Sequence, residues 1–268
     1  MRRPVPPDPW HPLRALTAAR IGLGRAGDNL PTDALLRFGM AHAEARDAVH
    51  SPLDAAALAD ALAERGLAPL AVRSEARDRA QYLRRPDLGR RLAEDDRAAL
   101  AAHPARGADS VLVLADGLSA AAVARHALPL LDALLPRLSG WTLGPPVIAL
   151  QARVALGDEI AEALDARQVV MLIGERPGLS SPDSLGAYLT QSPRRGRTDA
   201  ERNCLSNIRP EGLPPAAAAS RLAHLMVGAR ALGASGICLK DESASPGSLR
   251  AAAHEGACST QNREKPRN

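Results

Sequence analysis

The sequence has 268 residues, enough for one sizeable α/β domain with additional segments and too few for three independent cores. Its composition is 46% hydrophobic but only 2% aromatic, so a core must be built from Ala, Leu, Val and Ile. The formal net charge of +4 comes from 34 basic residues interleaved with 30 acidic ones. Because aromatic side chains for base stacking are almost absent, this balance argues against nucleic acid as a partner.

The cysteines and the N-terminus indicate the compartment. Cys204, Cys238 and Cys258 form neither an even disulfide framework nor a CxxC pair that begins a zinc site. The N-terminal MRRPVPPDPW has prolines where a signal peptide has an apolar stretch, and no run of eighteen apolar residues occurs. We therefore expect a cytoplasmic protein that is neither secreted nor membrane-spanning.

The first part of the chain, residues 1–104, predicts an arm followed by a small helical segment. The first ten residues are proline-rich and should be extended, as a loose arm or a clamp on a partner. From Thr32 to Gly66 apolar residues recur at helical spacing, with Pro31 and Pro52 in positions suited to helix starts. We expect this part to contact a partner.

Residues 105–241 alternate between strand-like and helix-like segments. The expected strands are Val111–Ala115, Val147–Arg153, Val169–Ile173 and Gly236–Leu239. The expected helices are one capped by Ser119 and running toward Leu138, one from Asp158 to Leu164, and one from Ala216 to Leu232. This alternation predicts an α/β fold, a Rossmann-like three-layer domain with a mainly parallel sheet. Residues 242–268 have few large apolar side chains and predict a disordered tail.

Gly22, Gly24 and Gly27 match the GxGxxG spacing of a dinucleotide site. Such a site needs a preceding strand, and the preceding RALTAAR is a better helix than strand. The interpretation as turn glycines is therefore favoured. The histidines lie outside any HExxH or comparable spacing, so a metal site is not expected.

Three polar segments are candidates for binding. Asp116–Ser119 and Gly174–Gly178 each follow a predicted strand, where ligands of parallel sheets usually lie, although an ordinary turn explains the first equally well. Thr198–Glu211, with Cys204 in its midst, predicts a binding loop. No nearby histidine supplies a base for Cys204, so packing or ligand contact is favoured over nucleophilic catalysis.

Several long motifs resemble the small (light) subunit of ethanolamine ammonia-lyase. They are GRAG from Gly24, VRSEARDRAQYLRRPDLGRRL from Val72, ADGLSA from Ala115 to QARVALGDEI ending at Ile160, GERPGLSSPDSLGAYLTQS from Gly174, and DAERNCLSNIRPEG from Asp199. The likeness covers roughly residues 14–241.

The resemblance implies a hetero-oligomer in which a larger, barrel-shaped subunit binds ethanolamine and houses adenosylcobalamin-dependent radical chemistry, yielding acetaldehyde and ammonia. This chain would cover the corrinoid and supply no catalytic residue or metal ligand. The cofactor contacts of the family match Val154 in QARVALGDE, Glu175 in GERPG and Cys204 in RNCLSNI. No histidine lies in a DxHxxG setting, which fits base-on cobalamin, as the resemblance also implies.

Alternatives remain open from the sequence. The chain could be a noncatalytic assembly or scaffold subunit that only stabilises the larger one, although retention of Val154, Glu175 and Cys204 favours cofactor contact. A standalone Rossmann-type enzyme is disfavoured by the missing catalytic pairings. Arg84, Arg85, Arg90 and Arg91 form either a phosphate-facing or partner-facing patch or, as is commoner, a solvated surface. Packaging in a bacterial microcompartment is not indicated and not excluded.

Overall fold

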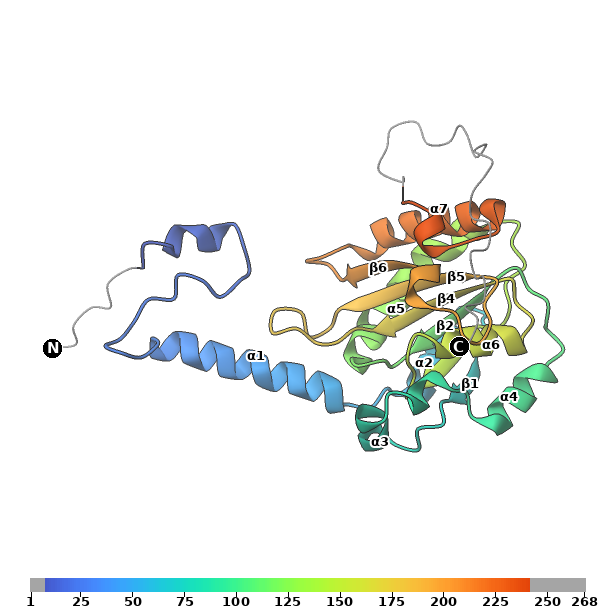
Figure 1. Ribbon diagram of the computed structural model, residues 1–268, viewed down its shortest axis with the longest axis horizontal. Coiled ribbons are helices and arrows are strands. Elements are labelled where there is room, and N and C mark those ends of the chain that lie inside the picture. The colour runs from blue at the N-terminus through green and yellow to red at the C-terminus, as the bar shows by residue number, and fades with distance from the viewer. Residues whose placement is uncertain (1–7, 242–268) are drawn as a thin grey trace, which may run out of the picture.

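The computed structural model describes residues 8–241, which form a six-stranded sheet with helices on both faces and an N-terminal arm (Figure 1). The strands are β1 (Leu70–Arg73), β2 (Val111–Ala115), β3 (Val147–Leu150), β4 (Gln168–Gly174), β5 (Leu185–Gln191) and β6 (Arg202–Ile208). Their order across the sheet is β1-β3-β2-β4-β5-β6. The predicted tail, residues 242–268, and the first seven residues of the predicted arm lie outside the described residues.

The sheet is mostly parallel, as the sequence predicted. Strands β1, β3, β2 and β4 pair in parallel, while β5 and β6 continue the sheet as antiparallel neighbours of β4. Parallel strands are joined by crossovers that place helices on the faces, and all residues of β2 and β4 are accordingly buried. The carboxyl ends of β2, β3 and β4 therefore lie at one edge of the sheet.

The helices divide between the two faces of the sheet. The α-helices are α1 (Thr32–His50), α2 (Ala55–Ala63), α3 (Arg79–Arg84), α4 (Glu94–Ala101), α5 (Ala120–Leu134), α6 (Leu156–Ala163) and α7 (Pro215–Leu232). The short 3₁₀ helices are η1 (His11–Ala15), η2 (Leu88–Arg90), η3 (Leu135–Leu138), η4 (Asp199–Glu201) and η5 (Gly236–Cys238). Helices α2, α5 and α7 pack in one apolar cluster and α4 and α6 in the other.

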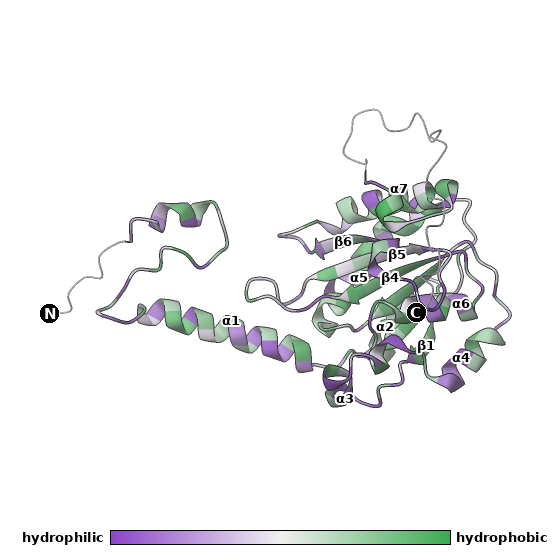
Figure 2. Cartoon of the chain, viewed as in Figure 1, coloured by the Kyte–Doolittle hydropathy of each residue, from purple (hydrophilic) through white to green (hydrophobic). Residues whose placement is uncertain are grey.

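Successive side chains of a strand point to opposite faces of the sheet and so pack in different apolar clusters. Leu112 and Leu114 of β2 face the cluster with α5 and α7, whereas Val111 and Val113 face the cluster with α6. Figure 2 shows the central strands as predominantly hydrophobic, in keeping with a sheet covered on both sides. Ser119 caps α5 by accepting a hydrogen bond from the Ala122 amide at 3.3 Å, as predicted.

The N-terminal part forms an arm that extends away from the sheet. Helix α1 projects sideways in Figure 1, and most of its residues are exposed. The guanidinium of Arg20 donates to the Leu179 carbonyl at 3.0 Å, and Arg79 donates to the Val49 carbonyl at 2.7 Å. The predicted helical content is confirmed by α1 and α2, but the segment before residue 105 also contributes β1 to the sheet. No helix within residues 8–241 is long and apolar enough to cross a membrane.

Two sequence-based expectations are wrong. Gly236–Leu239 is not a strand: Gly236 has a φ of +73°, and its amide donates to the Asn203 side chain at 2.7 Å, which fixes the 3₁₀ turn η5. Thr198–Glu211 is not a loop, because its centre is the edge strand β6. Arg202, Leu205 and Ile208 are its buried residues. Arg202 and Leu205 lie on opposite faces of the strand, and a register shift against β5 between Leu205 and Ile208 puts these two residues in the same apolar cluster. A search of the sequence for alternating apolar and polar residues therefore does not find this strand.

Candidate functional site

The ends of β2 and β3 are tied together by one buried carboxylate, Asp116. Its two oxygens accept hydrogen bonds from the backbone amides of Gln151 at 2.9 Å and Ala152 at 3.0 Å, and Arg79 lies 3.3 Å from it. Burial raises the pKa of Asp116, whereas the two amides and the Arg79 guanidinium oppose that shift. Asp116 thus positions the turn after β3, which leads to Arg153 and Val154.

The ends of β2 and β4 touch directly through two glycines. Gly117 has a φ of +55°, and the Leu118 amide donates to the Gly174 carbonyl at 2.9 Å. A Cβ on Gly117 would stand 2.2 Å from that carbonyl oxygen. Only glycine permits this approach.

A pocket of about 380 Å³ opens at these strand ends, and we call it the strand-end pocket. Its lining comes from α3, β4, β5, β6 and the turns that follow β2, β3 and β4. The lining residues are Tyr82, Gly117, Leu118, Arg153, Val154, Ile173, Gly174, Glu175, Arg176, Tyr188 and Ser206. Both tyrosines of the chain are among them.

Glu175 presents one carboxylate oxygen to this pocket. Its Oε2 accepts from the Asn207 amide at 3.1 Å and from the Ser184 hydroxyl. The other oxygen, Oε1, accepts no hydrogen bond from the described residues, and a Cβ on Gly186 would approach it to 3.0 Å. One oxygen therefore fixes the side chain and the other is available to a donor.

Cys204 reaches the pocket through Tyr188. The two residues face each other across β5 and β6, and the Tyr188 hydroxyl donates to the Cys204 sulfur. Partial desolvation, reinforced by the charge of Glu175, raises the pKa of the Cys204 thiol, while the hydrogen bond from Tyr188 opposes the shift. The thiol is consequently neutral near pH 7, which fits ligand contact better than nucleophilic attack.

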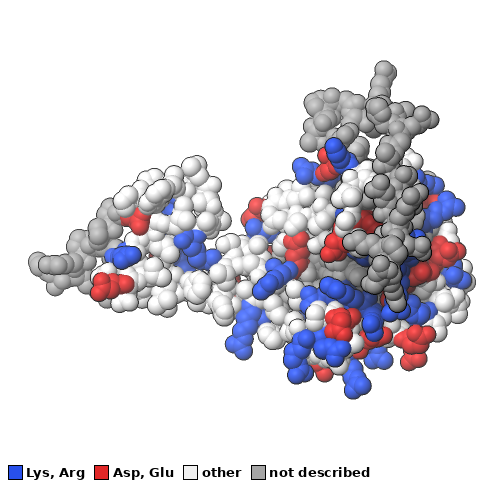
Figure 3. All heavy atoms as spheres, viewed as in Figure 1, with Lys and Arg blue, Asp and Glu red and all other residues white. Residues whose placement is uncertain are grey.

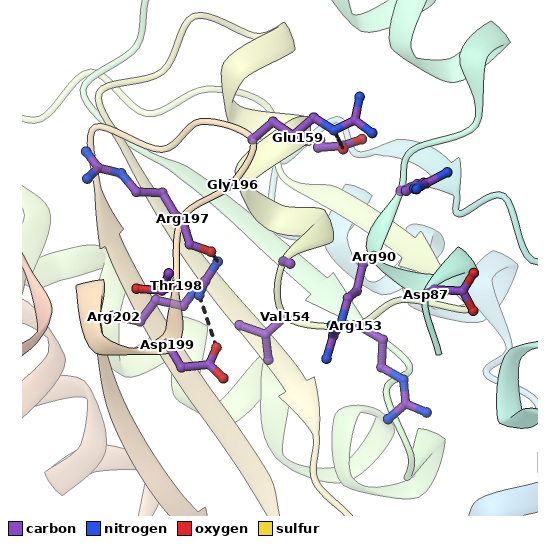
Figure 4. A pocket seen from close by; sticks show the side chains of 13 residues that line it. Asp87, Arg90, Arg153, Val154, Glu159, Gly196, Arg197, Thr198, Asp199 and Arg202 are labelled. Atoms are coloured by element: carbon purple, nitrogen blue, oxygen red, sulfur yellow. Dashed lines mark hydrogen bonds and ion pairs between the residues drawn. The ribbon is translucent and has the colours of Figure 1, made fainter. Parts of the chain in front are cut away.

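A second pocket of about 660 Å³ shares Arg153 and Val154 with the first, and we call it the arginine pocket (Figure 4). Six of its lining residues are arginines: Arg90, Arg91, Arg153, Arg195, Arg197 and Arg202. Strand β6 runs from one pocket to the other. Arg202 lines the arginine pocket and Ser206 lines the strand-end pocket, and Cys204 lies between these two residues in the strand. The two pockets therefore adjoin each other.

No group of three His, Cys, Asp or Glu side chains within residues 8–241 is arranged to hold a metal ion. Gly22, Gly24 and Gly27 lie in the arm at positive φ, and the described residues before them, 8–21, contain no strand, so the interpretation as turn glycines is confirmed.

Comparison with known proteins decides the family. The model of the ethanolamine ammonia-lyase light chain family matches residues 7–240. A protein of Azotobacter vinelandii named ethanolamine ammonia-lyase small subunit is 58% identical over 246 residues, 90% of this chain and 91% of the relative. Relatives of the same name from Pseudomonas putida (56%, covering 90% of each chain) and Ralstonia nicotianae (55%, covering 90% of this chain and 92% of the relative) are similar too.

The chain belongs to the ethanolamine ammonia-lyase light chain family. The resemblance noted in the sequence is therefore confirmed. The structure brings Val154 and Glu175, two of the three residues expected to contact a cofactor, into one pocket. It places the third, Cys204, beside that pocket in contact with Tyr188.

Sequence reasoning missed several residues of this light chain's pocket. Tyr188 and Tyr82 were not singled out, although the chain has only two tyrosines and both lie within quoted motifs. Arg153 directly precedes Val154 and was also missed. Rarity of a residue type inside a long family motif was the signal that could have found the tyrosines.

Proposed function

We propose that this chain is the small subunit of an ethanolamine ammonia-lyase and forms one wall of its adenosylcobalamin site. In this proposal a larger subunit binds ethanolamine and carries the groups that convert it to acetaldehyde and ammonia, and this chain supplies no catalytic residue. The observation that carries the assignment is the strand-end pocket, where Val154, Glu175 and the Tyr188–Cys204 pair converge at the carboxyl edge of the mostly parallel sheet.

The size of the pocket supports a shared site. A drug-sized ligand is usually enclosed by a pocket of roughly 300–1,000 Å³, and a corrinoid is larger than such a ligand. At about 380 Å³ the strand-end pocket holds only an edge of a corrinoid. The remaining surface must come from a second chain, which agrees with the small-subunit name of the relatives.

The side chains fit the edge of a corrin ring. Val154 offers an apolar surface, and Glu175 Oε1 is free to accept a hydrogen bond from an amide side chain of the ring. Cys204 offers a neutral, polarizable contact held by Tyr188. When bound, adenosylcobalamin supplies the radical chemistry, and these residues orient it and exclude water. Base-on binding is proposed because the sequence contains no histidine in a DxHxxG setting.

The arm, residues 8–50, is proposed to contact the large subunit. Trp10, Leu16, Leu35, Leu36 and Met40 are all more than half exposed. In Figure 3 much of the visible surface of the arm is uncharged, whereas basic and acidic groups are interleaved over the sheet domain. Exposed apolar side chains concentrated in one segment are typical of a protein–protein interface. We propose that the complex works in the cytoplasm, with packaging in a microcompartment left open.

Reconstitution tests the proposal against the scaffold alternative. The full chain is mixed with its candidate large subunit, adenosylcobalamin and ethanolamine, and acetaldehyde is followed with each component omitted in turn. Activity that requires both chains is expected. Activity of the large subunit alone would demote this chain to a scaffold.

A variant localises the cofactor contact. Glu175→Ala should weaken retention of cobalamin by the complex, whereas Glu211→Ala, which removes an exposed carboxylate outside both pockets, should not. Unchanged retention in the Glu175→Ala complex would contradict the assignment of Glu175.

A further inference from the structure

Within residues 8–241, each carboxylate that lines the arginine pocket already has an arginine partner. Asp87 lies 2.7 Å from Arg85, and Asp199 lies 3.0 Å from Arg202. Glu159 is buried and pairs with Arg97 and, at 3.4 Å, with Arg195. These three carboxylates therefore provide no further negative charge to balance the other arginines of the pocket.

Two arginines of the pocket, Arg90 and Arg153, have no carboxylate partner within residues 8–241. The Nε of Arg153 is fully buried and has no hydrogen-bond partner there. Figure 4 shows both side chains on one side of the pocket, with Arg197 and Arg202 on the other and Val154 between them. Holding two unpaired cations next to each other is unfavourable unless an anion lies between or beside them.

Local packing holds these two arginines in place. The guanidinium of Arg153 stacks on the Tyr82 ring at 4.6 Å, and its backbone amide donates to the Gly89 carbonyl at 2.8 Å. A Cβ on Gly89 would stand 2.9 Å from that ring and 3.0 Å from Arg153 Cγ, so η2 packs tightly against Arg153. Arg90 is the next residue of η2, so this packing fixes the position of its backbone beside Arg153.

An anion with several oxygens suits this arrangement. Guanidinium groups bind phosphate with parallel charge-assisted hydrogen bonds, and unpaired arginines converging in a pocket are a common phosphate site. The arginine pocket also adjoins the strand-end pocket, since Arg153 and Val154 line both. A ligand whose ring edge lies in the strand-end pocket can therefore extend its phosphate toward Arg90 and Arg153.

We infer that the arginine pocket binds a phosphate ester through Arg90 and Arg153, and that this ester is the phosphodiester in the nucleotide loop of cobalamin. The inference rests on the proposed function. Free inorganic phosphate offers the same chemistry, so the experiment must separate the two sources.

Cobinamide and cobinamide phosphate differ only by the phosphate group and isolate its contribution. Binding of each dicyano form to the complex of the full chain with its large subunit is measured by absorbance after ultrafiltration. Arg90→Gln is the main variant, because Arg90 is exposed and its loss should leave the fold intact. Arg106→Gln is the control, since Arg106 is also an exposed arginine that forms no ion pair with residues 8–241 but lies outside both pockets.

The expected result is that Arg90→Gln weakens binding of cobinamide phosphate about tenfold and leaves binding of cobinamide unchanged. Arg153→Met, which keeps an apolar stem against Tyr82, should act in the same direction, and Arg106→Gln should change neither. Equal losses for both ligands, or no loss for either, would overturn the inference.

A parallel measurement with inorganic phosphate tests whether the site takes free phosphate instead. If inorganic phosphate raises the melting temperature of the wild-type complex through Arg90, and cobinamide phosphate binds no better than cobinamide, the site takes free phosphate and the assignment to the cofactor is wrong. Failure of the complex to bind cyanocobalamin at all would instead count against the proposed function.

Discussion

The end of β2 and the end of β4 meet at Gly117 and Gly174, where the space for a single Cβ is occupied by a carbonyl oxygen. This contact fixes the distance between Asp116, which positions the turn carrying Arg153 and Val154, and Glu175, which follows Gly174. The geometry of the strand-end pocket thus depends on a position that tolerates no side chain.

Gly117→Ala should consequently lower the free energy of unfolding by about 3 kcal/mol, because it adds a backbone clash to the cost of a positive φ. Gly107→Ala is a matched control, because Gly107 also has a positive φ, +79°, but has open space around it. Its free energy of unfolding should fall by only about 1 kcal/mol. Urea denaturation of both variants measures the difference. Equal losses would mean that the approach of the two strands relaxes easily.

The pKa of the Cys204 thiol should shift in opposite directions when its two neighbours, Glu175 and Tyr188, are replaced. The charge of Glu175 raises the pKa of Cys204, so Glu175→Gln should lower it. The hydrogen bond from Tyr188 lowers that pKa, so Tyr188→Phe should raise it further above the ordinary 9.0. The measurement is the pH dependence of Cys204 alkylation by iodoacetamide, followed on its own peptide by mass spectrometry. Shifts of the same sign in both variants would contradict the described geometry.

The parallel part of the fold could be predicted because its strands are continuous apolar runs. Val111–Ala115 and Val169–Ile173 are buried on both faces and need no alternation to be recognised. The antiparallel edge was missed or misread because β6 carries Arg202, Asn203 and Ser206 and buries residues at a spacing of three. β-Strand formation there depends on pairing with β5 and not on local pattern.

The candidate site could be predicted only in part. Val154, Glu175 and Cys204 came from the family resemblance. Glu175 also had a signal of its own, as a charged residue directly after a strand, and Cys204 had one as the thiol of a polar segment, whereas Val154 had none. Tyr188 and Arg153 act through contacts between distant segments, such as the register of β5 with β6 and the stacking of Arg153 on Tyr82. Such contacts are set by tertiary packing and leave no local pattern.

Acid should abolish the contribution of Glu201 to stability. Backbone and side-chain hydrogen bonds from Thr198, with Arg197, lower the pKa of Glu201 to about 2. A lowered folded-state pKa gives stability that is present above the unfolded value, 4.5, and is lost as the pH falls toward 2. Because the side chain is 37% exposed, we expect Glu201→Gln to cost only about 1 kcal/mol at pH 7. Denaturation between pH 7 and pH 2 should show the difference from wild type shrink as the pH falls below 4.5; a difference that stays constant down to pH 2 would have another cause.

The proposed contact of the arm with the large subunit predicts a variant that weakens assembly without affecting folding. Leu36 on α1 is 68% exposed, so Leu36→Glu should leave the melting temperature of the isolated chain unchanged. If the arm contacts the large subunit, the same charge becomes buried without a partner and weakens the complex about tenfold or more. Val227→Glu on α7 is the control, since Val227 is 54% exposed but lies outside the arm. Sedimentation of each variant with the large subunit measures assembly. Equal binding by wild type and Leu36→Glu would place the interface elsewhere, and equal weakening by both variants would mean that added negative charge, and not the arm, is responsible.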